Sequence, residues 1–223
     1  MDKYKEIAKD ARLKVLDMIF NAQASHIGSN FSIIDIFAVL FEKIGPQDKV
    51  ILSAGWKAAS FYYFLAHKGI IPKEDLDTFC KEGSKYIGLT EPGVKGVEFA
   101  GGSMGMGFPA AVGFALAKKI KKEEGKVYVI MSDGELACGS TWEAACIARH
   151  HKLTNLVIII DANGFQAMGK TEDVLFANPA GVFHEFNVAE FGGHGYSTIE
   201  RVLDAKLSVQ APYLLYAHTI KGR

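Results

Sequence analysis

The chain has 223 residues, 49% of them hydrophobic, which is enough to bury the core of one α/β domain spanning residues 1–223. Its 25 lysines and arginines balance 25 aspartates and glutamates, so no overall charge attracts nucleic acid or an anionic membrane. The three cysteines lack metal-ligand spacing, the N-terminus lacks a signal-peptide core, and no apolar run approaches the roughly 18 residues of a membrane span, so we expect a cytoplasmic protein.

The first half of the chain alternates helical patterns with one short strand. Residues 3–22 carry apolar side chains at helical spacing. A second helix is expected to begin at a capping box formed by Ser32 and Asp35 and to end near Ile44. The following elements are, in order, a strand over 49–53, a helix over 56–67, a glycine-rich loop over 80–107 and a helix over 110–120.

The second half contains two continuous apolar runs, at residues 127–131 and 156–160, joined by a helix that begins near Gly139. Such runs predict parallel strands buried on both faces. The remaining elements are a structured loop over 166–183, a strand over 187–190, a helix over 197–207 and a strand over 213–217. The fold class is therefore α/β, with a doubly wound, mainly parallel sheet and helices on both faces.

Polar residues follow both apolar runs. Asp133 follows the first run and Asn163 the second, so both leave the sheet at the carboxyl edge, where ligands bind in such folds. A carboxylate, an amide oxygen and the main-chain carbonyl of Phe165 suit Mg²⁺ shared with phosphate oxygens. A lone strand that ends in Asp-Gly is common in α/β proteins without a metal, but the second element one crossover later favours the metal site.

Four short motifs in this region resemble those of transketolases, a thiamine diphosphate-dependent family, in order and spacing. They are Asp-Gly-Glu-Leu from Asp133, Gly-x-x-Trp-Glu-Ala over 139–144, Lys-Leu-x-Asn-Leu over 152–156 and Asp-x-Asn-Gly-x-Gln over 161–166. The similarity extends from His26 to Gly222. It implies a thiamine diphosphate-binding fold and the cofactors thiamine diphosphate and Mg²⁺.

The resemblance also implies roles for individual residues. His26 would face the substrate as a catalytic residue. Asp133, Asn163 and Phe165 would bind the metal. The expected cofactor-binding residues are Trp56, Gly102, Met104, Asp133, Gly134, Glu135, Asn163 and Phe165.

No part of this chain resembles the family's second domain, which holds the aminopyrimidine ring and the glutamate that activates it. The resemblance therefore implies the N-terminal subunit of a split transketolase. A C-terminal, pyrimidine-binding subunit would complete a heterotetramer, with Glu143 facing a neighbouring subunit. Together the subunits would transfer a two-carbon ketol unit from a ketose-type donor to an aldehyde acceptor.

Several family residues are replaced. Trp56 stands where the family has a histidine, and Cys138 where it has a glutamate that helps link two active sites. The chain stops at Arg223, before a further family histidine. Because substrate-side proton donors are missing, a non-standard donor or acceptor is expected. Two alternatives stay open: a carboligase or decarboxylase that uses a 2-keto acid, and a non-catalytic, regulatory subunit.

Overall fold

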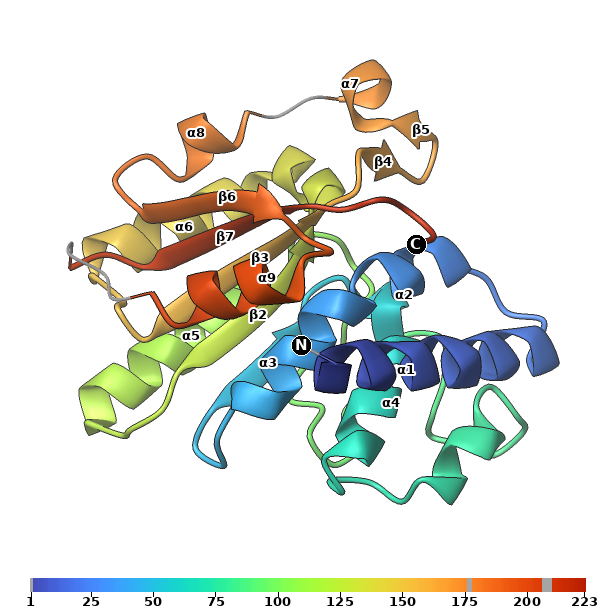
Figure 1. The fold of residues 1–223 in the computed structure, drawn as a ribbon. Coiled ribbons are helices and arrows are strands. Elements are labelled where there is room, and N and C mark those ends of the chain that lie inside the picture. The colour runs from blue at the N-terminus through green and yellow to red at the C-terminus, as the bar shows by residue number, and fades with distance from the viewer. Residues whose placement is uncertain (1, 176–177, 206–209) are drawn as a thin grey trace.

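A computed structural model describes residues 2–175, 178–205 and 210–223. Within these ranges, five parallel strands form one sheet in the order β1-β2-β3-β7-β6 (Figure 1). The strands are β1 (Lys49–Leu52), β2 (Val127–Ser132), β3 (Leu156–Ala162), β6 (Asn187–Gly192) and β7 (Tyr213–His218). The predicted α/β fold is confirmed, and the two apolar runs are the inner strands β2 and β3.

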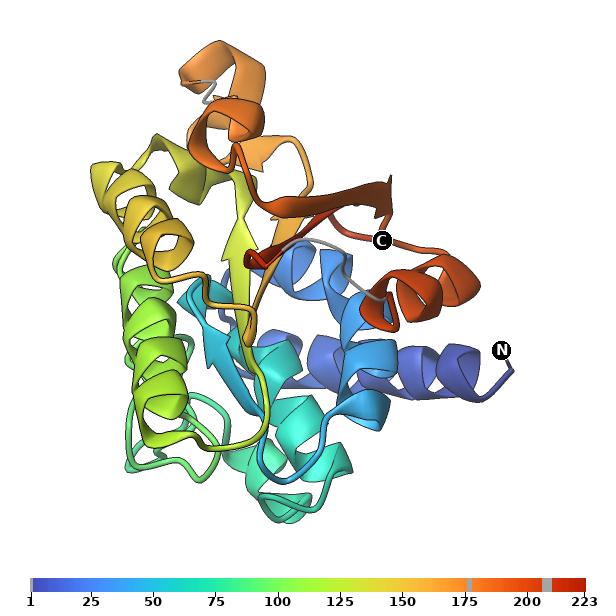
Figure 2. The same cartoon turned by 90° about the vertical axis from the view of Figure 1, so that its left-hand side faces the viewer.

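Helices cover both faces of this sheet, as Figure 2 shows. One face carries α5 (Gly107–Lys121) and α6 (Gly139–His150), and the other carries α1 (Asp2–Asn21), α3 (Ile34–Lys43), α4 (Ala58–His67) and α9 (Tyr196–Leu203). Alternate side chains of β2 enter the two cores: Val129 packs with α5 and α6, and Ile130 packs with the opposite helices. Since neither face meets water, the run over residues 127–131 is apolar throughout.

The shorter elements connect the longer helices and strands. They are α2 (Ile27–Ser32), α7 (Thr171–Val174), α8 (Pro179–Val182), the 3₁₀ turns η1 (Gly55–Lys57), η2 (Glu74–Thr78) and η3 (Asp133–Ala137), and a hairpin of β4 (Phe165–Gln166) and β5 (Gly169–Lys170). The hairpin, α7 and α8 occupy the segment for which the sequence predicts a structured loop. The predicted helix end at Leu207 lies outside the described residues. None of the described helices is long and apolar enough to cross a bilayer.

The predicted capping box at Ser32 and Asp35 is wrong. The first turn of α3 begins at Ile34, and no side chain caps it. Ser32 donates instead to Asp161 at 2.6 Å, and the Asp35 carboxylate binds Arg12 and His194. Although burial opposes ionisation, the hydrogen bonds from His194 and Arg12 lower the pKa of Asp35 to about 2. Both side chains thus have tertiary partners that a local motif does not show.

The core of β3 gives a first testable prediction. Ile158 is fully buried between β3 and the α5–α6 layer. Ile158→Val is expected to lower the free energy of unfolding by about 0.5–1.5 kcal/mol, because it removes a buried methylene and leaves a small cavity. The same change at Ile120, which is 72% exposed, should alter it by less than about 0.5 kcal/mol. Urea unfolding compares the two variants, and equal effects would contradict the assignment of this core.

Candidate functional site

The carboxyl ends of β2 and β3 lie side by side, as predicted. Ser132 pairs with Asp161 in the parallel register, so Asp133 and Asn163 follow neighbouring strands at one edge. The Oδ2 atom of Asp133 accepts a hydrogen bond of 2.8 Å from the backbone N–H of Gly164. The segment that carries Asn163 is therefore in direct contact with the Asp133 carboxylate.

Asp133 is a buried carboxylate without a cationic side-chain partner among the described residues. It accepts hydrogen bonds from the N–H of Gly134 at 3.0 Å and from the hydroxyl of Thr171 at 3.1 Å. Burial raises its pKa, and the nearby charge of Asp161 raises it further. A cation at this position would compensate the buried charge.

The neighbouring groups can complete an oxygen-rich cation site. The Oδ1 atom of Asn163 accepts from the N–H of Phe165 at 3.1 Å and keeps a second lone pair. Beside Asp133 is a cavity of about 290 Å³ that Gly164 and Thr171 also line. The described residues contain no group of three or more His, Cys, Asp and Glu side chains placed to hold a metal. One carboxylate and one amide oxygen suit Mg²⁺, which uses few carboxylates and takes other ligands from water and phosphate.

Glu135 lies beneath this edge rather than on it. Its carboxylate is fully buried and accepts hydrogen bonds from the N–H of Ser132 at 2.9 Å, from the N–H of Gly105 at 3.2 Å and from the hydroxyl of Ser53. Burial raises the pKa of Glu135. These bonds join the ends of β1 and β2 to the glycine-rich loop. The predicted role of Glu135 in cofactor binding stays a prediction.

The glycine-rich loop brings Met104 to Gly134. A Cβ atom built on Gly134 would lie 3.3 Å from Cε of Met104 and 3.3 Å from Cγ of Gln166. Met104 is 40% exposed and Gly102 is half-buried, so both can line a surface site. A Cβ on Gly55 would collide with the backbone of Gly101, which explains why the loop can approach the turn after β1.

His26 and Trp56 form a second group, joined by Asn30. The side-chain amide of Asn30 donates to the carbonyls of His26 and Trp56, at 3.0 Å each. His26 is exposed and has a left-handed backbone, with φ of 72°. Desolvation of its ring, followed by the charges of Lys221 and Lys57, lowers the pKa of His26. The shift favours the neutral imidazole, which can accept a proton.

A buried ion pair that no sequence motif indicated lies between these two groups. Lys57 and Asp161 are both fully buried and in contact. Burial alone would raise the pKa of Asp161, but the charge of Lys57 and its hydrogen bond lower it. The one visible sign in the sequence is a lysine between Trp56 and two alanines, at the start of a helix that is otherwise apolar.

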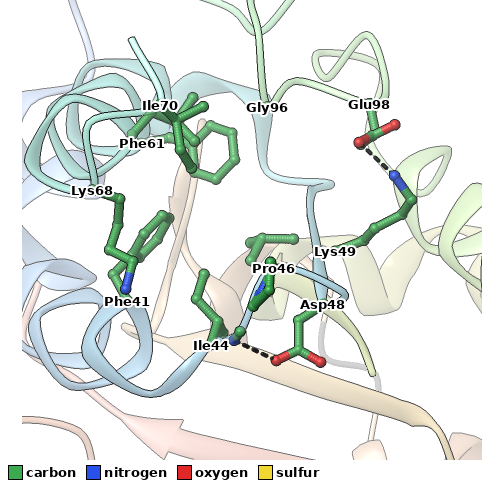
Figure 3. A pocket seen from close by; sticks show the side chains of 13 residues that line it. Phe41, Ile44, Pro46, Asp48, Lys49, Phe61, Lys68, Ile70, Gly96 and Glu98 are labelled. Carbon is green, nitrogen blue, oxygen red and sulfur yellow. Dashed lines mark hydrogen bonds and ion pairs between the residues drawn. The ribbon is translucent and has the colours of Figure 1, made fainter. Parts of the chain in front are cut away.

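A separate cavity of about 370 Å³ lies at the amino end of β1, where Lys49 begins the strand (Figure 3). Phe41, Phe61 and Ile70 form its apolar wall, and a 2.6 Å ion pair joins Lys49 to Glu98 at its rim. None of the predicted site residues lines this cavity. It is therefore distinct from the candidate site at the carboxyl ends of the strands.

The sequence matches the family described as "Transketolase, thiamine diphosphate binding domain" over residues 3–223. It is 35% identical over 236 residues to an apulose-4-phosphate transketolase subunit of Actinobacillus succinogenes, covering 99% of this chain and 86% of the relative. It is 31% identical over 230 residues to the 6-deoxy-6-sulfo-D-fructose transketolase subunit SqwG of a Clostridium species, covering 95% of this chain and 82% of the relative.

Solved structures are also similar. The transketolase of Campylobacter jejuni superposes with a TM-score of 0.93 at 31% identity, over 98% of this chain. The match covers 38% of that transketolase chain. This fold therefore corresponds to a little more than a third of that transketolase chain, whereas it accounts for most of each of the two subunit relatives.

Proposed function

This chain belongs to the transketolase thiamine diphosphate-binding domain family, and on that basis we propose that it is one subunit of a two-component transketolase. With a pyrimidine-binding partner subunit it would transfer a two-carbon ketol unit from a ketose-type donor to an aldehyde acceptor. The observation that carries the proposal is the buried carboxylate of Asp133, which has no cationic side-chain partner among the described residues and contacts the segment that bears Asn163.

In the proposed site, Asp133, the side-chain oxygen of Asn163 and the carbonyl of Phe165 would hold Mg²⁺, which would supply positive charge for the diphosphate. Gly134 and Met104 would lie beside the cofactor, and Gly102 would allow the main chain to approach its ring. When bound, thiamine diphosphate supplies a carbon nucleophile and an electron sink. The chain itself would bind, orient and exclude water.

His26 is proposed to exchange a proton with the substrate. It is exposed, and its lowered pKa favours the neutral imidazole. A histidine in this state can act as a general base or, once protonated, as a general acid. Trp56, half-buried beside Asn30, would form part of the substrate wall where the family has a histidine. We therefore expect substrate preferences that differ from those of ordinary transketolases.

The partner is proposed to be a separately encoded pyrimidine-binding subunit, in a cytoplasmic heterotetramer. Support comes from two relatives that are named as transketolase subunits, of whose length this chain spans 86% and 80%. Glu143, expected to face a neighbouring subunit, is exposed on α6.

The proposed function is tested by purifying the chain together with its partner and titrating the complex with thiamine diphosphate, in Mg²⁺ or in EDTA. Binding that requires Mg²⁺, followed by two-carbon transfer in a screen of ketose donors and aldehyde acceptors, is the expected result. Metal-dependent binding with activity only on 2-keto acids would identify the carboligase alternative. A complex that binds no thiamine diphosphate in Mg²⁺ would overturn the proposal.

The raised pKa of Asp133 predicts how binding depends on pH. The carboxyl group must lose its proton to bind a metal, so lowering the pH should weaken Mg²⁺ binding. The loss should begin at a higher pH than for an ordinary aspartate, because burial favours the protonated form. Calorimetric titration of the complex across mildly acidic and neutral pH measures this. A His26→Gln variant should keep the same dependence, and an affinity that is flat over the range would contradict it.

A further inference from the structure

The Lys57–Asp161 ion pair joins four elements at the carboxyl edge of the sheet. Lys57 lies in the turn after β1, and Asp161 lies near the end of β3. The ammonium group of Lys57 contacts Oδ2 of Asp161 and donates to the carbonyl of Ser29 in α2 at 3.1 Å. Thr219, directly after β7, donates to Oδ1 of Asp161. The desolvation of two buried charges can cost as much free energy as their attraction returns, so a contribution to stability does not by itself account for this pair.

The pair acts directly on Asn163. The side-chain NH₂ of Asn163 donates to Oδ2 of Asp161 at 3.3 Å, while the side-chain oxygen of Asn163 accepts from the N–H of Phe165. A carboxylate can only accept hydrogen bonds. If the amide turned over, its oxygen would face the Asp161 carboxylate and its NH₂ would face an N–H donor. The charge on Asp161 therefore selects one of the two orientations of the Asn163 amide.

Lys57 has a matching effect on charge. Asp161 lies opposite Ser132 in the register of β2 and β3, so its carboxylate is next to the strand end that leads into Asp133. Because the ammonium of Lys57 holds Oδ2 of Asp161, this second carboxylate is compensated and engaged within the protein. The negative charge left for a cation is then that of Asp133.

We propose that Lys57 and Asp161 are positioning residues, which orient the Asn163 oxygen toward the cation and keep Asp161 from competing for it. The inference rests on the proposed function, since it concerns the same diphosphate-binding site. It assigns a role to a lysine that none of the motifs includes, and it links the Asn163 side to the His26 side through Ser29.

The test measures Mg²⁺ affinity at saturating thiamine diphosphate, by calorimetry, in the complex with the partner subunit. The double variant Lys57→Met/Asp161→Leu replaces the ion pair by apolar side chains, a change that buried pairs often tolerate. It is expected to fold, as urea unfolding will show, and to bind Mg²⁺ about 10–100-fold more weakly, the usual effect of losing an outer-shell partner. A folded double variant with wild-type affinity would overturn the proposal.

A second variant covers the case in which the double variant does not fold. Asp161→Asn keeps the side-chain shape but removes the charge that selects the Asn163 orientation. It should also weaken Mg²⁺ binding about tenfold or more, and wild-type affinity would again overturn the proposal. Lys118→Met is the matched control, because Lys118 is buried but donates to the carbonyl of Glu124, and its affinity should equal that of the wild type.

The outcomes separate the two proposals. If the wild-type complex binds no thiamine diphosphate in Mg²⁺, the proposed function fails. If the wild-type complex binds thiamine diphosphate in a metal-dependent way and both variants bind Mg²⁺ with wild-type affinity, the proposed function stands and only the positioning role fails.

Discussion

Asp133→Asn is expected to weaken Mg²⁺-dependent binding of thiamine diphosphate by more than about 100-fold. Losing a residue that orients a metal ligand lowers metal affinity by about 10–100-fold, and losing a direct ligand should lower it more. The variant keeps the side-chain shape but removes the buried negative charge that a cation would neutralise. Calorimetric titration of the complex measures the change.

The control for this variant is Asp17→Asn, the same substitution at an exposed position of α1. It should bind the cofactor as the wild type does. Superimposable titration curves for the two variants would show that Asp133 is not a ligand.

The same substitution should change the pH dependence of stability in the metal-free protein. Burial raises the pKa of Asp133, so the folded state holds this proton more tightly than the unfolded state. The free energy of unfolding should therefore fall as the pH rises from the unfolded pKa to the folded one. This decline should be absent in Asp133→Asn. Urea unfolding at a series of pH values compares the two, and identical profiles would contradict the prediction.

Lys57→Met alone is expected to lower the free energy of unfolding by about 3–5 kcal/mol. Removing one member of a buried ion pair leaves an uncompensated charge, here the fully buried carboxylate of Asp161. Urea unfolding at neutral pH measures the loss. The double variant Lys57→Met/Asp161→Leu should recover part of it, because no buried charge remains, while the hydroxyls of Ser32 and Thr219 lose their acceptor.

The matched control is Lys118→Met, a buried lysine that donates to a backbone carbonyl and leaves no charge behind. It should lower the free energy of unfolding by about 0.5–1.5 kcal/mol, the net value of one hydrogen bond.

The wild-type contribution of the Lys57–Asp161 pair to stability should also depend on pH. Since Lys57 lowers the pKa of Asp161 against the effect of burial, the contribution is full above about pH 3.9, the unfolded value. It is lost as the pH falls through the folded pKa. Equal losses of unfolding free energy in Lys57→Met and Lys118→Met would contradict the importance of the ion pair.

The strands and the edge at which they meet were predictable because they depend on local patterns. Residues 127–131 and 156–160 are continuous apolar runs, and such runs form buried parallel strands. Once two parallel strands pair, the residues after them must lie at one edge, which is why Asp133 meets the segment that carries Asn163 and Gly164. The roles assigned to these residues and to His26 came from resemblance to a family and stay predictions until binding is measured.

Local patterns in the sequence are sufficient for the fold class, the inner strands and the meeting of Asp133 with the Asn163 segment, since apolar periodicity and strand direction are local properties. The hydrogen-bond and ion-pair partners of the buried polar side chains are decided by the tertiary structure. Ser32 has the form of a helix cap but donates to Asp161, and Lys57 lies among apolar residues but pairs with the same carboxylate, 104 residues away. A buried polar group takes whichever partner the packed chain brings near, because leaving it unpaired costs more than leaving a local motif unformed.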